Sequence, residues 1–262
     1  MGEDVAKGEN ASEALSLFIR CCSALLCFPD GRGRASKNAS GTIIQTNGKK
    51  FVILTVKHIL SEWSLSDKEK ADQVEIVLYK KNTLRSVIHS LIPHPNLDIM
   101  MIVLNSGNDS GLIDRFIDVE TIQPNREKYE ETDLLFLSGF PFGLEKTDIK
   151  NRRQEIPFLH IPLVPDNVAL RENRAIVEWN ILADDPRPEL GNLPPYGMSG
   201  SGFWEFRTVN KGDIWSPAKC IRLAGIQESW DPCTRKVFVV PSIEWADWAR
   251  VECDKIDAVM PV

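Results

Sequence analysis

The sequence has no long apolar run, no strongly basic segment and no paired-cysteine motif, and each absence argues against a class of protein. An apolar stretch at residues 14–28 is interrupted by Arg20 and follows an acidic, polar start, so it predicts neither a membrane span nor a secretory signal. The net charge is −6 and the densest basic cluster is residues 150–153, which disfavours a nucleic-acid partner. Six cysteines without a C-x-x-C spacing argue against zinc and favour a reduced, cytoplasmic protein.

Histidine is also scarce, and its placement limits the hydrolase classes that the chain can join. Only four histidines occur, and all precede Ser199, which lies in the glycine-rich stretch Gly197–Gly202. A serine between glycines is often only a turn, but it becomes a candidate nucleophile when a base and an orienting acid accompany it. The α/β-hydrolase order needs a histidine after the serine, and Ser201 breaks the G-x-S-x-G form. The order histidine, aspartate, serine stays open.

His58 is the candidate base because it follows a predicted strand. Residues 41–46 and 50–56 are β-branched and apolar, and Asn47-Gly48 between them predicts a hairpin. A histidine at the end of a strand can be directed toward a functional site. His94 is a loop histidine between two prolines, and His89 and His160 lie in mixed segments with no obvious acid or nucleophile.

Asp98 is the candidate acid, because it stands at the start of the apolar run at residues 99–104. A buried carboxylate there needs a partner, and an imidazolium is a natural one. Two other interpretations stay open. Asp98 can cap a turn before a buried strand, or it can share a zinc ion with His94, although no third ligand has a recognisable spacing.

Several segments together resemble the trypsin-like, chymotrypsin-fold serine peptidases, especially their cytoplasmic and bacterial domains. Leu54–His58 is similar to the L-T-A-A-H segment, Asn96–Met101 to N-D-I-A-L-L, and Gly197–Ser201 to G-D-S-G-G. Leu223–Ile226 resembles the strand that follows the nucleophile and lines the substrate cleft, and Leu134–Pro141 resembles the first strand of the second barrel.

The resemblance implies an all-β fold of two six-stranded antiparallel barrels with a short C-terminal helix. It implies an intracellular serine endopeptidase with Ser199 as nucleophile, His58 as base and Asp98 as orienting acid, and with the N–H groups of Gly197 and Ser199 as the oxyanion hole. The expected divisions are an N-terminal helix within 1–22, in which Ser12 caps a helix through Arg20, barrels at 23–120 and 121–241, and a C-terminal helix at 242–262. Residues 29–40 are expected to form a loop.

The sequence departs from the family pattern at positions that affect regulation and specificity. Met198 replaces the aspartate that secreted members use for activation, so we expect no zymogen of that type. Leu193 stands where trypsin-type enzymes have an aspartate, and one extra residue precedes Ser229-Trp230. Leu193, Gly225 and Glu228 are therefore the candidate substrate-binding residues, without a predicted cleavage preference.

The expected partners are a protein or peptide substrate and a regulatory protein, with no nucleic acid, membrane, metal or cofactor. A non-catalytic binding module on the same fold is the alternative function.

Overall fold

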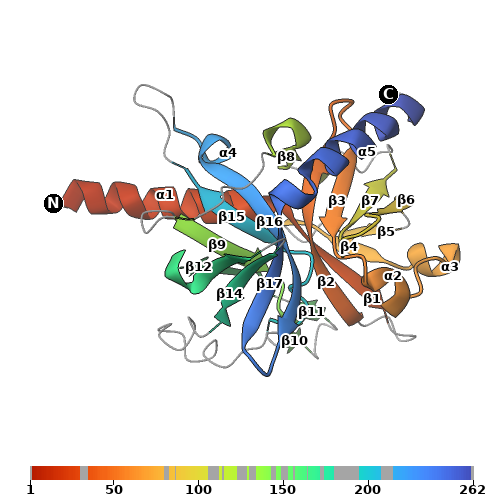
Figure 1. Ribbon diagram of the computed structural model, residues 1–262, viewed down its shortest axis with the longest axis horizontal. Coiled ribbons are helices and arrows are strands. Elements are labelled where there is room, and N and C mark those ends of the chain that lie inside the picture. The colour runs from red at the N-terminus through yellow and green to blue at the C-terminus, as the bar shows by residue number, and fades with distance from the viewer. Residues whose placement is uncertain are drawn as a thin grey trace.

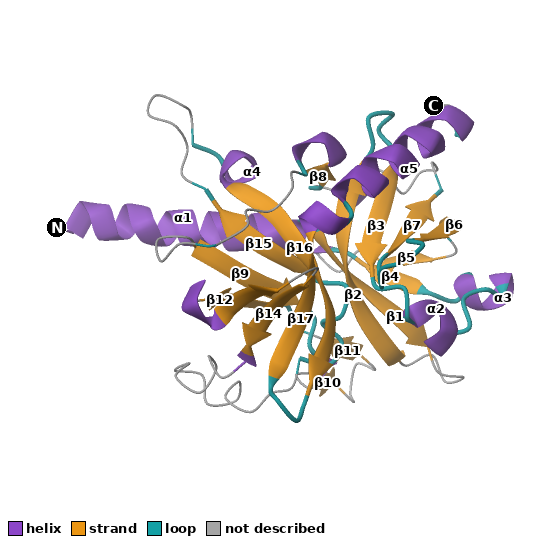
Figure 2. Cartoon of the chain, viewed as in Figure 1, coloured by secondary structure: helices purple, strands orange, loops and turns teal. Residues whose placement is uncertain are grey.

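The computed structural model consists mostly of strands, with helices at the periphery (Figure 1 and Figure 2). It describes residues 2–29, 35–79, 83–85, 87–105, 112–113, 115–122, 129, 134–142, 146–148, 153–155, 157–163, 165–171, 174–179, 195–207 and 215–260. The helices are α1 Gly2–Cys21, α2 Ile59–Glu62, α3 Lys68–Ala71, α4 Pro217–Cys220 and α5 Ala246–Val259. Within these residues, no helix combines the length and apolar character needed to cross a membrane.

The first sheet is formed by the N-terminal half of the chain. Its strands are β1 Ser23–Pro29, β2 Ala35–Gln45, β3 Phe51–Thr55, β4 Glu75–Val77, β5 Thr83–Arg85, β6 Ile88–Pro93, β7 Met100–Leu104 and β8 Ile117–Asp118. They follow the order β5-β4-β1-β2-β3-β7-β6, and all these pairs are antiparallel. The short strand β8 is added to β2 in parallel.

The second sheet follows in the chain. Its strands are β9 Leu134–Gly139, β12 Leu159–Leu163, β13 Val168–Arg171, β14 Arg174–Glu178, β15 Gly202–Phe206, β16 Ile221–Asp231 and β17 Lys236–Pro241. They are antiparallel in the order β12-β9-β15-β16-β17-β14-β13. A separate hairpin joins β10 Lys146–Asp148 to β11 Arg153–Glu155.

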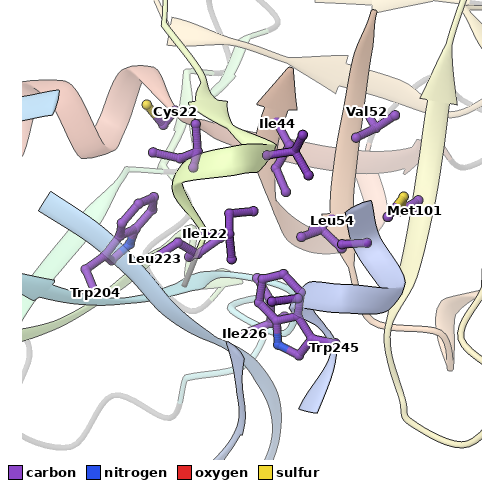
Figure 3. Packing of buried hydrophobic residues seen from close by; sticks show 14 of the residues in the cluster. Cys22, Ile44, Val52, Leu54, Met101, Ile122, Trp204, Leu223, Ile226 and Trp245 are labelled. Carbon is purple, nitrogen blue, oxygen red and sulfur yellow. The ribbon is translucent and has the colours of Figure 1, made fainter. Parts of the chain in front are cut away.

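Three large apolar clusters and a small one, formed by Leu25, Cys27 and Phe140, pack the sheets within the described part of the chain. One cluster lies within each curled sheet, and another lies between the sheets and includes Leu54 and Met101 from the first sheet and Trp204 and Ile226 from the second (Figure 3). Alternate residues of β3 and β7 face the first-sheet cluster and the intersheet cluster. Both strands are therefore buried on both faces, which explains why their sequences are continuous apolar runs rather than alternating patterns.

The predicted two-barrel architecture with a short C-terminal helix is confirmed. The sheets curl into half-barrels and contain eight and seven strands among the described residues, where six each were expected. Short additions account for part of the difference, since β5 has three residues and β8 has two. The C-terminal helix α5 returns to the first sheet (Figure 1), where Asp257 Oδ1 accepts from Thr46 Oγ1 at 2.5 Å and Oδ2 accepts from Gly48 N at 2.6 Å.

Two local predictions are wrong. Helix α1 begins at Gly2 rather than after Ser12, and five of the ten residues that precede Ser12 in this helix, two Glu, two Ala and one Lys, are good helix formers. Of the segment predicted to be a loop, residues 35–40 instead form the first half of β2, because they pair with β1. Pro29 ends β1, and residues 30–34 lie outside the described residues. The small polar residues in the first half of β2 have low strand propensity, and the pairing with β1 overrides this preference.

Candidate active site

His58 lies three residues after the end of β3, immediately before α2. Its carbonyl oxygen accepts hydrogen bonds from the N–H of Glu62 at 3.1 Å and from Ser61 Oγ at 2.9 Å. Its own N–H donates to Asp98 Oδ1 at 2.7 Å. Hydrogen bonds thus hold the backbone of His58 at both its N–H and its carbonyl.

Asp98 meets His58 with both carboxylate oxygens. Besides the backbone contact, Asp98 Oδ2 lies 2.6 Å from His58 Nδ1. The side chains are 34% and 23% exposed, for His58 and Asp98 respectively, so the pair is only partly shielded from water. This arrangement fixes the tautomer in which Nδ1 carries the proton and leaves Nε2 as the basic nitrogen.

The pKa of the His58 imidazole lies above its ordinary value. Burial alone lowers it, but the hydrogen bond and negative charge of Asp98 raise it, and the charges of Glu62 and Glu228 add to this effect. The net result is a ring that gains a proton more readily than free imidazole, as a general base must.

His94 holds the turn that presents Asp98, a role that the sequence did not reveal. Its Nδ1 accepts from the N–H groups of Leu97 at 3.0 Å and Asn96 at 3.2 Å, and its carbonyl accepts from Lys57 Nζ at 3.0 Å. Burial and the nearby charge of Lys57 lower the pKa of His94, which keeps this acceptor unprotonated. Nδ1 is therefore occupied by the backbone, which argues against the zinc interpretation. Within the described residues, no three His, Cys, Asp or Glu side chains are grouped to hold a metal.

Ser199 lies partly exposed in a turn before β15, within residues 195–201, which we call the serine loop. Two of its glycines have left-handed backbones, with φ of +85° at Gly197 and +89° at Gly200. A Cβ at Gly200 would lie 2.0 Å from the carbonyl oxygen of Ser40 and 2.3 Å from Thr55 Oγ1. Glycine at this position therefore lets the serine loop approach the end of β3, three residues before His58.

The serine and histidine sides of the site are not joined by a hydrogen bond. Among the residues that the structure describes, neither the Ser199 hydroxyl nor His58 Nε2 has a hydrogen-bond partner. The N–H groups of Gly197 and Ser199 likewise donate to no acceptor in this part of the chain. The serine loop thus contains a hydroxyl and two N–H groups, those of Gly197 and Ser199, that have no hydrogen-bond partner among the described residues.

Comparison with solved structures identifies the architecture around this site. A serine endoprotease from Yersinia pestis superimposes with a TM-score of 0.54 at 12% identity, over 93% of this chain and 66% of that one. A thermostable serine protease, AL20, from an extremophilic microorganism gives 0.50 at 10% identity, over 88% of this chain and 98% of that one. A Glu endopeptidase gives 0.50 at 11% identity, over 92% of each chain.

The chain has the chymotrypsin fold of the trypsin-like serine peptidases. It spans just under two thirds of the length of the Yersinia pestis structure. No protein-family profile and no curated protein sequence matches it. Within this fold, His58 and Asp98 come from the first sheet and its turns, whereas Ser199 comes from the second half of the chain.

The three predicted substrate-binding residues have different surroundings. Leu193 lies outside the described residues. Gly225 is buried in β16, and a Cβ there would lie 2.7 Å from Val239 Cγ1, so strand packing alone requires glycine. Glu228 occupies the position where the pairing of β16 with β17 shifts register between Gln227 and Ser229. The extra residue before Ser229-Trp230 is thus absorbed as a β-bulge.

Glu228 is a buried carboxylate beside the His58–Asp98 pair. Arg174 Nη2 donates to Glu228 Oε1 at 2.9 Å, while the buried Oε2 has no hydrogen-bond partner among the described residues. Burial raises the pKa of Glu228 and the charge of Asp98 raises it further, although Arg174 and His58 oppose this. The bulge therefore places an acidic side chain close enough to the candidate site to act on it electrostatically.

Proposed function

We propose that this protein is a serine endopeptidase that uses His58, Asp98 and Ser199 as its catalytic triad. The observation that carries the proposal is the two-point contact of Asp98 with the N–H and Nδ1 of His58. Such a contact has a direct chemical use, since it sets the tautomer that a general base needs. The chymotrypsin fold and the glycine-rich turn around Ser199 support the same function.

The proposed reaction follows from these groups. Ser199 Oγ attacks the peptide carbonyl carbon while its proton passes to His58 Nε2, and the carbonyl oxygen becomes an oxyanion that the N–H groups of Gly197 and Ser199 stabilise. The C–N bond then breaks as His58 gives the proton to the departing amine. Water, deprotonated by the same imidazole, attacks the acyl-enzyme and releases the acid with restoration of Ser199.

Substrate recognition is proposed to involve Glu228. Leu193 and Gly225 are proposed as well, by analogy with the substrate-binding positions of the trypsin-like peptidases. The unpartnered Oε2 of Glu228 is an acceptor that a donor group of the substrate can satisfy, because a buried carboxylate oxygen without a partner is costly. The 23–120 and 121–241 segments are proposed as two lobes that complete the site only when packed together. The substrate is a protein or peptide, and a regulatory protein partner is part of the proposal.

A reducing compartment such as the cytoplasm is the proposed location. None of the six cysteines, all of which belong to the described residues, forms a disulfide. Burial raises the pKa of the Cys27 thiol, with a contribution from Glu75, and the pKa of the Cys253 thiol, with contributions from nearby carboxylates, to about 12 in each case. Such thiols stay protonated and unreactive.

One observation favours the alternative, a non-catalytic binding module. The Ser199 hydroxyl makes no hydrogen bond to His58 within the described part of the chain. In hydrolases without substrate this contact is often long and shortens only in the complex, so it does not decide between the two functions.

A fluorophosphonate probe separates the two functions. Only a deprotonated, oxyanion-stabilised serine displaces fluoride from phosphorus at a useful rate, so we expect the wild type to be labelled and Ser199→Ala to be unlabelled. Ser201→Ala is the matched control, because Ser201 is buried two residues away and its Oγ contacts Gln227 Oε1 at 3.2 Å. Peptide mass spectrometry should place the adduct on Ser199 in both reactive proteins.

A folded wild type that resists labelling would support the binding module instead. For a reactive enzyme, the cleavage preference comes from new N-termini that wild type, and not Ser199→Ala, generates in a proteome.

A further inference from the structure

Ser40 of β2 contacts the serine loop from the opposite sheet. The residue is fully buried, and its N–H donates to the carbonyl oxygen of Ser199 at 2.8 Å. Its hydroxyl donates to the carbonyl oxygen of Gly197 at 2.9 Å and accepts from the N–H of Phe140 at 3.0 Å. One first-sheet residue therefore holds two carbonyls of the loop that carries the candidate nucleophile.

Each of the four carbonyl oxygens from residue 196 to residue 199 accepts a hydrogen bond. Besides the two carbonyls bound by Ser40, the Tyr196 carbonyl accepts from Phe142 N at 2.7 Å and the Met198 carbonyl accepts from Ser201 N at 2.8 Å. Because a peptide group is planar and trans, a fixed carbonyl also fixes the direction of the N–H in the same group. The loop therefore has little freedom to rotate one peptide without breaking a hydrogen bond.

The two unpaired N–H groups belong to this fixed set. The Gly197 N–H shares its peptide with the Tyr196 carbonyl, and the Ser199 N–H shares its peptide with the Met198 carbonyl. Each N–H therefore points away from a carbonyl that already has a donor. The peptide between them is the one whose carbonyl the Ser40 hydroxyl binds, so Ser40 controls how the two donors are oriented relative to each other.

Neighbouring contacts fix Ser40 and the loop from two further sides. Asn38, two residues earlier on the same face of β2, donates from Nδ2 to the Phe140 carbonyl at 3.2 Å. Thr55 Oγ1 donates to the Ser40 carbonyl at 2.8 Å. On the loop itself, the Met198 side chain is fully buried in the second-sheet cluster. Hydrogen bonds and apolar burial thus hold the same loop from opposite sides.

We infer that Ser40 is a positioning residue that keeps the two N–H donors of the serine loop ready for the oxyanion before any substrate or partner binds. This inference rests on the proposed peptidase function, because it assigns these donors to the oxyanion of that reaction. It adds that the loop requires no second chain for its order, since this chain already supplies the donors that hold its carbonyls.

Thr42→Val is a matched control for Ser40→Ala. Thr42 is also fully buried on β2, two residues further along, but its hydroxyl has no hydrogen-bond partner among the described residues. Both changes remove one buried hydroxyl from one strand, and only Ser40→Ala removes a contact with the serine loop. Ser40→Cys keeps a donor at the same position, although a weaker one on a larger atom.

The first measurement is the fluorophosphonate labelling rate and its end point. We expect Ser40→Ala to be labelled about 10- to 100-fold more slowly than Thr42→Val, less than the 10²–10³ typical for removal of an oxyanion donor, because the donors stay but lose their fixed direction. The final stoichiometry should stay the same, and Ser40→Cys should recover part of the rate. A purely structural role would instead lower the labelled fraction and leave the rate of the remainder unchanged.

The second measurement does not depend on activity. Hydrogen exchange of peptides that cover residues 196–202 should be faster in Ser40→Ala than in Thr42→Val, with exchange in β16 unchanged. Equal rates of labelling in the two variants, or equal exchange of the loop, would overturn the inference. If the wild type is not labelled at all, the peptidase proposal fails, while exchange still decides whether Ser40 holds the loop.

Discussion

Replacing Asp98 with asparagine tests whether Asp98 sets the tautomer of His58. The change exchanges one carboxylate oxygen for an NH₂ group and keeps the size of the side chain. Asp98 Oδ1 accepts from the His58 N–H at 2.7 Å, so the amide oxygen of an asparagine must occupy that position to avoid two facing donors. The NH₂ group then faces Nδ1 at the place where Oδ2 lies, 2.6 Å away. Nδ1 becomes an acceptor and Nε2 carries the proton, which is the wrong tautomer to deprotonate Ser199.

The expected loss follows from this tautomer change. In serine peptidases the same substitution lowers turnover about 10⁴-fold, or about 5.5 kcal/mol of transition-state stabilisation. The loss of negative charge also lowers the pKa of His58, because Asp98 supplies the hydrogen bond and the charge that raise it. Both effects act on the imidazole and neither touches the serine loop.

The assay is the second-order rate of fluorophosphonate labelling at pH 8, with thermal unfolding as a check on folding. Glu62→Gln is the control, because Glu62 raises the pKa of His58 by its charge alone. We expect Asp98→Asn to lose about four orders of magnitude and Glu62→Gln to stay within about threefold of wild type. Labelling of Asp98→Asn within tenfold of wild type would refute the assignment of Asp98, and so would an equal loss in Glu62→Gln.

Two further predictions concern pH. Glu228→Gln removes a charge that raises the pKa of His58, so the pH of half-maximal labelling should fall; an unchanged or higher midpoint would contradict the placement of Glu228 beside the pair. Burial lowers the pKa of His160 from 6.5 to about 4, so the unfolded chain binds the proton more tightly and stability falls as pH drops from 6.5 toward 4, by about 3 kcal/mol. His160→Phe, which keeps a ring stacked on Phe136, should flatten this part of the pH dependence of urea unfolding, and an unchanged slope would show that His160 does not cause it.

Local sequence patterns were sufficient for the parts of the site that depend on strand ends. The apolar run before His58 and the run after Asp98 became adjacent antiparallel strands, with Thr55 opposite Met100. This pairing places the two ends side by side, so the histidine and the carboxylate meet. The hairpin at Asn47-Gly48 also forms, although the left-handed residue is Lys49, with φ of 61°.

Residues whose role depends on the exact backbone conformation of a turn or a bulge cannot be identified from the sequence. His94 was interpreted as an ordinary loop histidine, because nothing in the sequence shows that its Nδ1 would accept from the N–H groups of Asn96 and Leu97. The sequence shows one extra residue before Ser229-Trp230, but the β-bulge that places Glu228 is evident only once the register of β16 and β17 is known. Both roles follow from the backbone, a turn at His94 and a bulge at Glu228. Patterns in a single sequence do not determine the backbone in this detail.

In the first half of β2, the residues that contact the serine loop are not those that favour a strand. Asn38 and Ser40 are poor strand formers, and the segment was expected to be a loop, yet their small polar side chains are what the serine loop requires. A valine at position 40 would suit a strand better but would remove the hydroxyl partner of the buried Phe140 N–H and of the partly buried Gly197 carbonyl. The strand is therefore kept by its pairing with β1 rather than by its own sequence. Low strand propensity next to an apolar strand is, in this chain, a sign of polar contacts across the boundary between the two sheets.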